Sequence, residues 1–244
     1  MTTGYEPLGI PKSFGTDIWI VDGPTIRFYG MPFPTRMTVV RLSDGGLWIH
    51  SPIALDDALR ARIEALGPVR HLVAPNWIHY ASVHQWQAVW PEATTWAAPK
   101  VESRAAAHNV PIRIDHLLDN TATPPWAGEI AFRHVSGSAV HSEVVFFHRA
   151  SRTLILTDLI ENFDPRHLPW WMSALTRLVG ITAPDGRTPP DIAATFRKNR
   201  AEARGHVDWM LAQAPERVIL AHGRCYETEA LPRLRRALKG LAGR

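Results

Sequence analysis

The hydrophobic positions of this chain form short runs, and runs typical of strands alternate with runs typical of helices. The predicted strands are residues 17–21, 25–29, 37–42, 47–50, 69–74, 94–97, 129–135, 143–148, 153–158 and 217–221. The predicted helices are residues 55–66, 78–90, 101–108, 192–212 and 229–241, with one more around Trp170 and Trp171. This interleaving indicates an α/β fold.

Turn residues divide these elements. Asp22-Gly23-Pro24 predicts a turn between the first two strands, and Ser43-Asp44-Gly45-Gly46 predicts a hairpin between the next two. Because hairpins pair their strands in antiparallel fashion, we expect mixed sheets. Residues 180–190 hold three prolines and two glycines, which predicts a long loop that could cover a site.

Composition narrows the class of protein. The 244 residues are 45% hydrophobic and 20% charged, which is typical of a globular protein, and we expect one domain over residues 1–244. The single cysteine, Cys225, excludes an intramolecular disulfide and a cysteine-based metal cluster. No apolar run of transmembrane length and no signal-peptide pattern occurs, so we expect a cytoplasmic protein. The net charge of +4 is interpreted as a solvated basic helical face, and no nucleic-acid partner is expected.

Residues that can bind a metal follow three of the predicted strands. His79 comes shortly after residues 69–74, Asp158 ends one strand, and His222 directly follows another. A fourth candidate, His141, precedes residues 143–148. Each alone has an ordinary structural explanation, such as a helix cap for Asp158. Strand ends in α/β sheets gather at one edge, however, and two imidazoles with a carboxylate suit Zn²⁺, Fe or Mn.

The order and spacing of these residues resemble the metallo-β-lactamase superfamily, from about residue 37 to residue 240. The hairpin that ends in His50-Ser51-Pro52 is similar to the family's first hairpin, although the family has Asp-Thr-Gly at that turn. The resemblance implies an αββα sandwich of two mixed sheets flanked by helices.

The resemblance also implies a metal site with fewer ligands than the family usually has. Residues 74–79, Ala-Pro-Asn-Trp-Ile-His, stand in place of the family's His-x-His-x-Asp-His motif, and only His79 matches it. Asp158 matches the family's bridging aspartate, His222 matches its terminal histidine, and His141 lies two positions beyond its turn histidine. One of the family's two metal sites has therefore lost its leading ligands. We expect one divalent ion, Zn before Fe or Mn, held by His79, Asp158 and His222 with His141 as a candidate fourth ligand.

By the same resemblance, the expected function is hydrolysis of a small or medium apolar ester, lactone or amide. Asp158, His141 and Glu143 are the candidate catalytic residues. The family often uses its motif aspartate as general base, and because Ile78 stands there, the candidates for that role are Glu143, His84 and His141. Tryptophans cluster around the site-bearing segment and before the predicted covering loop, and they either pack in the core or line an apolar cleft for the substrate; they are Trp77, Trp86, Trp90, Trp96, Trp170 and Trp171. A further alternative for Trp170 and Trp171 is contact with a membrane or a partner.

Other functions remain open at this stage. Loss of family ligands is also what a non-catalytic binding protein on the same fold would show, with no metal bound. A nuclease is disfavoured because phosphodiester cleavage profits from two metal ions. A redox-active iron site is a further alternative, since histidine and aspartate bind Fe as well as Zn. The oligomeric state is not predicted.

Overall fold

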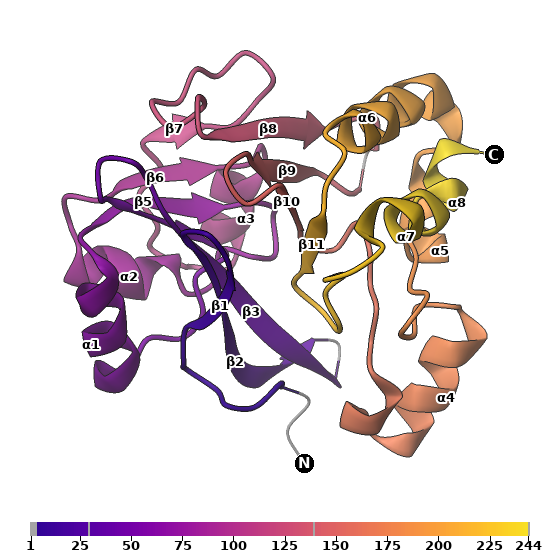
Figure 1. Ribbon diagram of the computed structural model, residues 1–244, viewed down its shortest axis with the longest axis horizontal. Helices are drawn as coiled ribbons and strands as arrows, with labels where there is room; N and C mark the ends of the chain where they lie inside the picture. Colours follow the sequence, from indigo (N-terminus) through magenta and orange to yellow (C-terminus); the bar gives the residue numbers. More distant parts are fainter. Residues whose placement is uncertain (1–3, 29, 139, 244) are drawn as a thin grey trace.

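Two β-sheets pack face to face, and helices cover their outer sides (Figure 1). The computed structural model describes residues 4–28, 30–138 and 140–243. The first sheet has the strand order β1-β2-β3-β4-β5-β6-β7, and the second has the order β11-β10-β9-β8. The strands of the first sheet are β1 (Lys12–Gly15), β2 (Ile18–Phe28), β3 (Met31–Arg41), β4 (Leu47–His50), β5 (Val69–Ala74), β6 (Thr94–Ala97) and β7 (His116–Leu117). Those of the second are β8 (Ile130–Val135), β9 (Glu143–His148), β10 (Thr153–Leu156) and β11 (Arg217–Leu220).

Both sheets are mixed, as predicted. Strands β1 to β4 pair in antiparallel fashion, whereas β4 to β7 run parallel. In the second sheet, β8, β9 and β10 are antiparallel, and β11 runs parallel to β10. The expected αββα arrangement of two mixed sheets is therefore the one that the chain adopts.

Helices connect and cover the strands. They are α1 (Asp57–Leu66), α2 (Val83–Val89), α3 (Val101–Ala107), α4 (Trp170–Leu178), α5 (Pro190–Thr195), α6 (Arg200–Ala212), α7 (Ala230–Ala237) and α8 (Lys239–Ala242), with 3₁₀ turns η1 (Pro165–His167) and η2 (Arg197–Asn199). None of the helices within the described ranges has both the length and the apolar character needed to cross a membrane.

Strand β9 shows how the sequence builds these layers. All six of its residues are buried, so both faces of the strand are covered. Val144 and Phe146 belong to the core between the two sheets, whereas Val145 and Phe147 belong to the core beneath α6, α7 and α8. Because successive side chains of a strand point to opposite faces, one continuous apolar run supplies both cores.

The turn predicted at residues 22–24 is wrong, because β2 runs straight through it. Asp22 pairs with Arg36 in register on β3, and a bulge between Gly23 and Ile26 accommodates Pro24, which lacks an N–H for the ladder. The predicted second strand is thus the continuation of β2, and its last residue, Tyr29, lies outside the described residues. The hairpin predicted at residues 43–46 is confirmed by the pairing of β3 with β4.

Three predicted helices are shorter than expected. Residues 78–82 are not helical, because the Asn76 side chain accepts the backbone N–H groups of Ile78 and His79 and holds a turn there. The helix predicted over 192–212 is divided into α5, η2 and α6, with Phe196 buried at the break. The last helix is divided at Leu238 into α7 and α8.

A buried ion pair joins the first sheet to the end of β11. Arg36 on β3 is 5% exposed and lies 2.8 Å from Asp22 Oδ1 on β2. The same guanidinium donates to the carbonyl oxygens of Leu220 and Gly223, which lie on either side of His222. Every charge in this group is thus paired or hydrogen-bonded, as burial requires.

We expect Arg36→Met to lower the free energy of unfolding by about 3–5 kcal/mol, because it leaves buried Asp22 with Lys12 as its one remaining cation and removes the donor to the carbonyl oxygens of Leu220 and Gly223. The control is Arg41→Met, which removes an exposed ion pair with Asp17 and should lower that free energy by less than about 1 kcal/mol. Denaturant unfolding of both variants measures the difference. If both variants lowered the free energy of unfolding by the same small amount, Arg36 would not be what holds the first sheet to the end of β11.

Candidate metal centre

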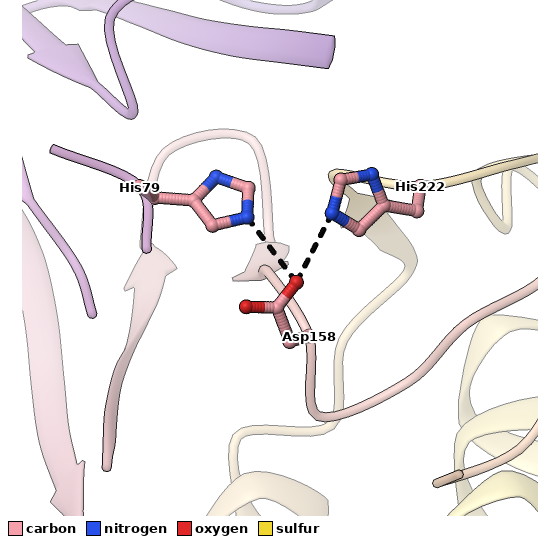
Figure 2. A group of neighbouring side chains, drawn as sticks. All are labelled: His79, Asp158 and His222. Atoms are coloured by element: carbon pink, nitrogen blue, oxygen red, sulfur yellow. Dashed lines mark hydrogen bonds and ion pairs between the residues drawn. The ribbon is translucent and has the colours of Figure 1, made fainter. Parts of the chain in front are cut away.

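Three predicted metal ligands converge on one carboxylate oxygen (Figure 2). Asp158 Oδ1 lies 3.2 Å from His79 Nε2 and 3.0 Å from His222 Nε2. One ligand atom from each residue lies within 4.8 Å of the others. His79 follows β5, whereas Asp158 and His222 follow the parallel strands β10 and β11. The residues predicted from the strand ends, His79, Asp158 and His222, therefore lie next to one another in the folded chain.

The loop after β5 holds His79 from two directions. Its backbone N–H donates to Asn76 Oδ1 at 2.9 Å, which fixes the turn that carries the ring. Its Nδ1 lies 2.7 Å from Ser51 Oγ at the end of β4. Because Nδ1 is engaged with Ser51, Nε2 is the nitrogen turned toward Asp158.

Asp158 is held by one amide side chain and one buried carboxylate. Asn76 Nδ2 donates to Asp158 Oδ2 at 2.6 Å, which leaves Oδ1 to face the two histidines. Glu143, at the start of β9, accepts the backbone N–H groups of Thr157, Asp158 and Leu159 at 2.7, 2.9 and 3.0 Å. Glu143 thus orders the loop on which Asp158 lies.

His222 is oriented by the first sheet. Its Nδ1 lies 2.9 Å from the carbonyl oxygen of Pro34 on β3, and a carbonyl can only accept, so Nδ1 carries the proton. The next residue, Gly223, has φ +96° and lies against the backbone of Asn162, where a Cβ would collide with the carbonyl oxygen. Glycine is therefore required at this turn.

The position of the proton on the His222 ring shows whether a cation fits between His222 and Asp158. With the proton on Nδ1, the neutral ring turns the lone pair of Nε2 toward Asp158 Oδ1. Two electron-rich atoms 3.0 Å apart need either a second proton or a cation between them. Donation from Nδ1 to a backbone carbonyl is also the usual orientation of a metal-binding histidine. The donor set of two imidazoles and one carboxylate fits a divalent ion of the Zn, Fe or Mn type.

The charges in this group reinforce one another. Burial alone would raise the pKa of Asp158, but the two histidines hold that pKa well below its usual range. Burial would likewise lower the pKa of His79, and the Asp158 carboxylate outweighs that effect and raises it. Asp158 is therefore an anion in the folded protein, as a metal ligand must be.

A cavity of about 810 Å³ lies over these three residues, all of which line it. Most of the remaining lining is apolar. It comes from β2, β3, α4, the segment around α5 and the loops after β4, β5, β10 and α4, and it includes Ile26, Met31, Phe33, Ile53, Phe163, Met172 and Leu175. Ile181, Pro189 and Pro190 at the ends of the predicted covering loop also line the cavity.

Fewer tryptophans line this cavity than the sequence predicted for a substrate cleft. Trp77 lines the cavity, whereas Trp86 and Trp96 are buried in the core, where they pack with neighbours such as Trp90 and Trp126. Most of the tryptophans near the site-bearing segment thus have the packing role that was one of the two alternatives. The apolar lining is provided by aliphatic residues, phenylalanines and prolines instead.

Three further predicted residues, His141, Glu143 and His84, lie apart from the metal-ligand group. His141 lines the cavity, but its Nε2 is buried 3.3 Å from Glu143 Oε2 without hydrogen-bond geometry and is not part of the group. Glu143 does not line the cavity, and its oxygens are engaged with three backbone amides. His84 on α2 does not line it either. The ligand role of His141 and the general-base roles stay predictions.

Sequence reasoning missed two acidic residues that line the cavity, Glu161 and Asp191. Burial raises the pKa of Glu161 to about 8, and Asp158 and Asp191 add to that rise against the opposing effect of His222. The position of Glu161, three residues after Asp158, was a signal that could have found it. Asp191 had none, since it lies at the start of a helix far along the chain.

We expect Glu143→Gln to lower both thermal stability and metal content. The NH₂ group of the new side chain cannot accept a hydrogen bond, so at least one of the three backbone N–H groups would lose its acceptor and the loop that carries Asp158 would be less ordered. Each donor left unpaired in a buried place lowers the free energy of unfolding by about 1–3 kcal/mol. Thermal unfolding and metal analysis measure the two effects on one sample. Normal stability and metal content with lost turnover would instead assign Glu143 to the chemistry.

Comparisons with known proteins agree with the fold. No curated protein matches the sequence. Among solved structures, DIM-1 metallo-β-lactamase exposed to ceftazidime has a TM-score of 0.65 and 14% identity, with 94% of this chain and 96% of that chain covered. A metallo-β-lactamase from Hirschia baltica has a TM-score of 0.60 and 13% identity, with 92% and 95% covered. The metallo-β-lactamase FIM-1 from Pseudomonas aeruginosa, in its mono-zinc form, has a TM-score of 0.55 and 15% identity, with 98% of each chain covered.

At these identities the likeness concerns the fold, which is that of the metallo-β-lactamases. A family model described as a domain of unknown function, DUF4336, matches residues 16–176, which is more than half of the sequence. The chain therefore belongs to the DUF4336 family and has a metallo-β-lactamase fold.

Proposed function

We propose that this protein is a metal-dependent hydrolase with one divalent ion, held by His79, Asp158 and His222, that cleaves a small or medium apolar ester, lactone or amide. The observation that carries the proposal is the convergence of three ligand atoms where an apolar cavity meets the ends of β10 and β11. The fold and this His–Asp–His group fit a metal hydrolase in general.

A single ion is favoured by the residues at the other family positions. Ala74 and Asn76 stand where the family has its first two histidines, and neither is an imidazole. Asn76 uses its amide to hold Asp158 and the His79 turn. The mono-zinc form of FIM-1 supports the idea that this fold accommodates one zinc ion.

A divalent ion bound there would polarise a carbonyl oxygen and make a water ligand more acidic. The chain's own residues contribute orientation and exclusion of solvent. Ser51 and the Pro34 carbonyl fix the two imidazole rings, and Asn76 fixes the carboxylate. Trp77, Ile78 and Val140 line the cavity beside them and present apolar surface to a substrate.

The substrate class follows from the cavity. Its lining is mainly apolar, with histidines and carboxylates gathered at the metal-ligand group, and such a site recognises an apolar body next to one polar, reactive group. Arg104 also lines the cavity, but its guanidinium lies over the Trp77 ring, 4.8 Å from the centroid. Apolar esters, lactones and amides have the required combination.

A binding protein without metal is the second candidate. It is favoured by one observation: both histidines lie within hydrogen-bond distance of Asp158, so an imidazolium at His222 could replace the cation. Metal content distinguishes the two functions.

We expect purified wild-type protein to carry about one equivalent of Zn, Fe or Mn per chain, and the double variant His79→Ala/His222→Ala to carry none, because two of the three ligands are gone. His108→Ala, which changes an exposed histidine at the C-terminal end of α3 that does not line the cavity, should retain the metal. Elemental analysis with parallel ester hydrolysis tests this. No metal in the wild type, even after reconstitution, would reject the hydrolase.

We expect kcat/KM for p-nitrophenyl esters to rise with acyl length, by up to about fourfold per methylene that enters the cavity. The variant Ile26→Ser should flatten this rise, because Ile26 lines the cavity and is 44% exposed, so the fold tolerates the change. Leu117→Ser, at a similarly exposed leucine on β7, is the matched control. Equal rates for acetate and octanoate esters would argue against an apolar substrate.

A further inference from the structure

Helix α4 has its amphipathic pattern inverted. It buries two hydroxyl side chains, Ser173 and Thr176, together with Met172. It exposes Trp170 and Leu178, each 84% accessible, and also Trp171 and Leu175. A helix that packs only against its own protein would turn these four large apolar side chains inward. We define them as the α4 apolar face.

The α4 apolar face adjoins the opening of the cavity. Met172, Leu175, Thr176 and Val179 line the cavity, and Leu175 is also 45% exposed, so it belongs to both surfaces. Figure 1 shows α4 at the edge of the molecule beside the end of the β2–β3 ribbon, and Met31 and Phe33 of that ribbon pack against Met172 and its neighbours. A molecule held by this face would therefore lie next to the cavity that the metal-ligand group lines.

Basic side chains accompany this face. Residues 165–180 contain Arg166 and Arg177 and no acidic residue. Arg27, at the end of β2, and Arg224 are exposed as well. The adjacent acid, Asp164, is buried and is paired with both Arg166 and Arg224. The surroundings of the apolar face thus attract anions.

We propose that the α4 apolar face docks on an anionic lipid surface and that the cavity takes a lipid-like, acyl-bearing substrate from it. Tryptophan and leucine on one side of a short helix, with arginine beside them, are suited to the boundary between headgroups and acyl chains. A protein partner could also cover the exposed apolar side chains. The neighbouring arginines and the apolar cavity that Leu175 lines favour an anionic lipid surface instead, because such a surface offers both negative charge and acyl chains. The substrate part of this inference rests on the proposed function; the docking part does not.

Vesicle flotation tests the docking directly. We expect the wild type to bind vesicles of phosphatidylcholine with phosphatidylglycerol at least about tenfold more tightly than vesicles of phosphatidylcholine alone. The double variant Trp170→Ser/Leu178→Ser should lose about tenfold or more in affinity, and Arg177→Glu about fivefold or more. None of these three residues lines the cavity, and all are exposed, so the variants should fold.

Matched controls are Leu117→Ser on β7 and Arg149→Glu in the turn after β9, both at exposed positions outside α4. They should bind vesicles within about twofold of the wild type. Absence of binding by the wild type, or equal losses in the controls, would overturn the docking. An α4-dependent dimer in sedimentation analysis that abolishes vesicle binding would also overturn it, because a second copy would then be the occupant.

Activity separates this inference from the proposed function. The α4 variants should hydrolyse dissolved p-nitrophenyl butyrate like the wild type but lose most turnover of a long-chain ester presented in anionic vesicles. Equal turnover of the vesicle-borne ester by wild type and α4 variants would overturn the delivery of substrate from the surface. A wild type without metal or turnover that still floats with vesicles would reject the hydrolase and retain the docking.

Discussion

The site depends on one buried carboxylate that faces two imidazoles from different parts of the fold. Asp158 meets His79 from the first sheet and His222 from the end of β11, so its position fixes how the two sheets are related at this edge. Its own place is set by Glu143, which collects three backbone amides, and by Asn76. An anion buried in this way is stable only with charged or hydrogen-bonding partners, and the surrounding segments are arranged to supply them.

Asn76 has a structural role beside the metal-ligand group. It uses both ends of its amide: Oδ1 holds the turn that carries His79, and Nδ2 holds Asp158. An imidazole could not make these contacts together, since the amide offers an acceptor and two donors in one plane. With its amide engaged in this way, Asn76 leaves His79, Asp158 and His222 as the ligands of the proposed single ion.

Much of the fold and of the site could be predicted from the sequence. The strand ends indicated His79, Asp158 and His222. Parallel pairing of β10 with β11 brings Asp158 and His222 to one edge, whereas His79 follows β5 of the other sheet and meets them through the packing of the two sheets. The sequence could not reveal that Pro24 lies in a bulge, because the Asp22–Arg36 pair that keeps β2 extended is formed with another strand. Nor could it reveal that Glu143 is occupied by backbone amides or that Asp191 lines the cavity, since both depend on tertiary packing. Single-domain organisation stays a prediction.

The central claim is that one cation, rather than a proton, lies between these three side chains. Anomalous diffraction from crystals grown with zinc, recorded on both sides of the zinc absorption edge, tests it most directly. The account predicts one strong anomalous peak in contact with Nε2 of His79, Nε2 of His222 and Oδ1 of Asp158. No peak, with both histidines bonded directly to the carboxylate, would contradict it, and so would two peaks of equal strength.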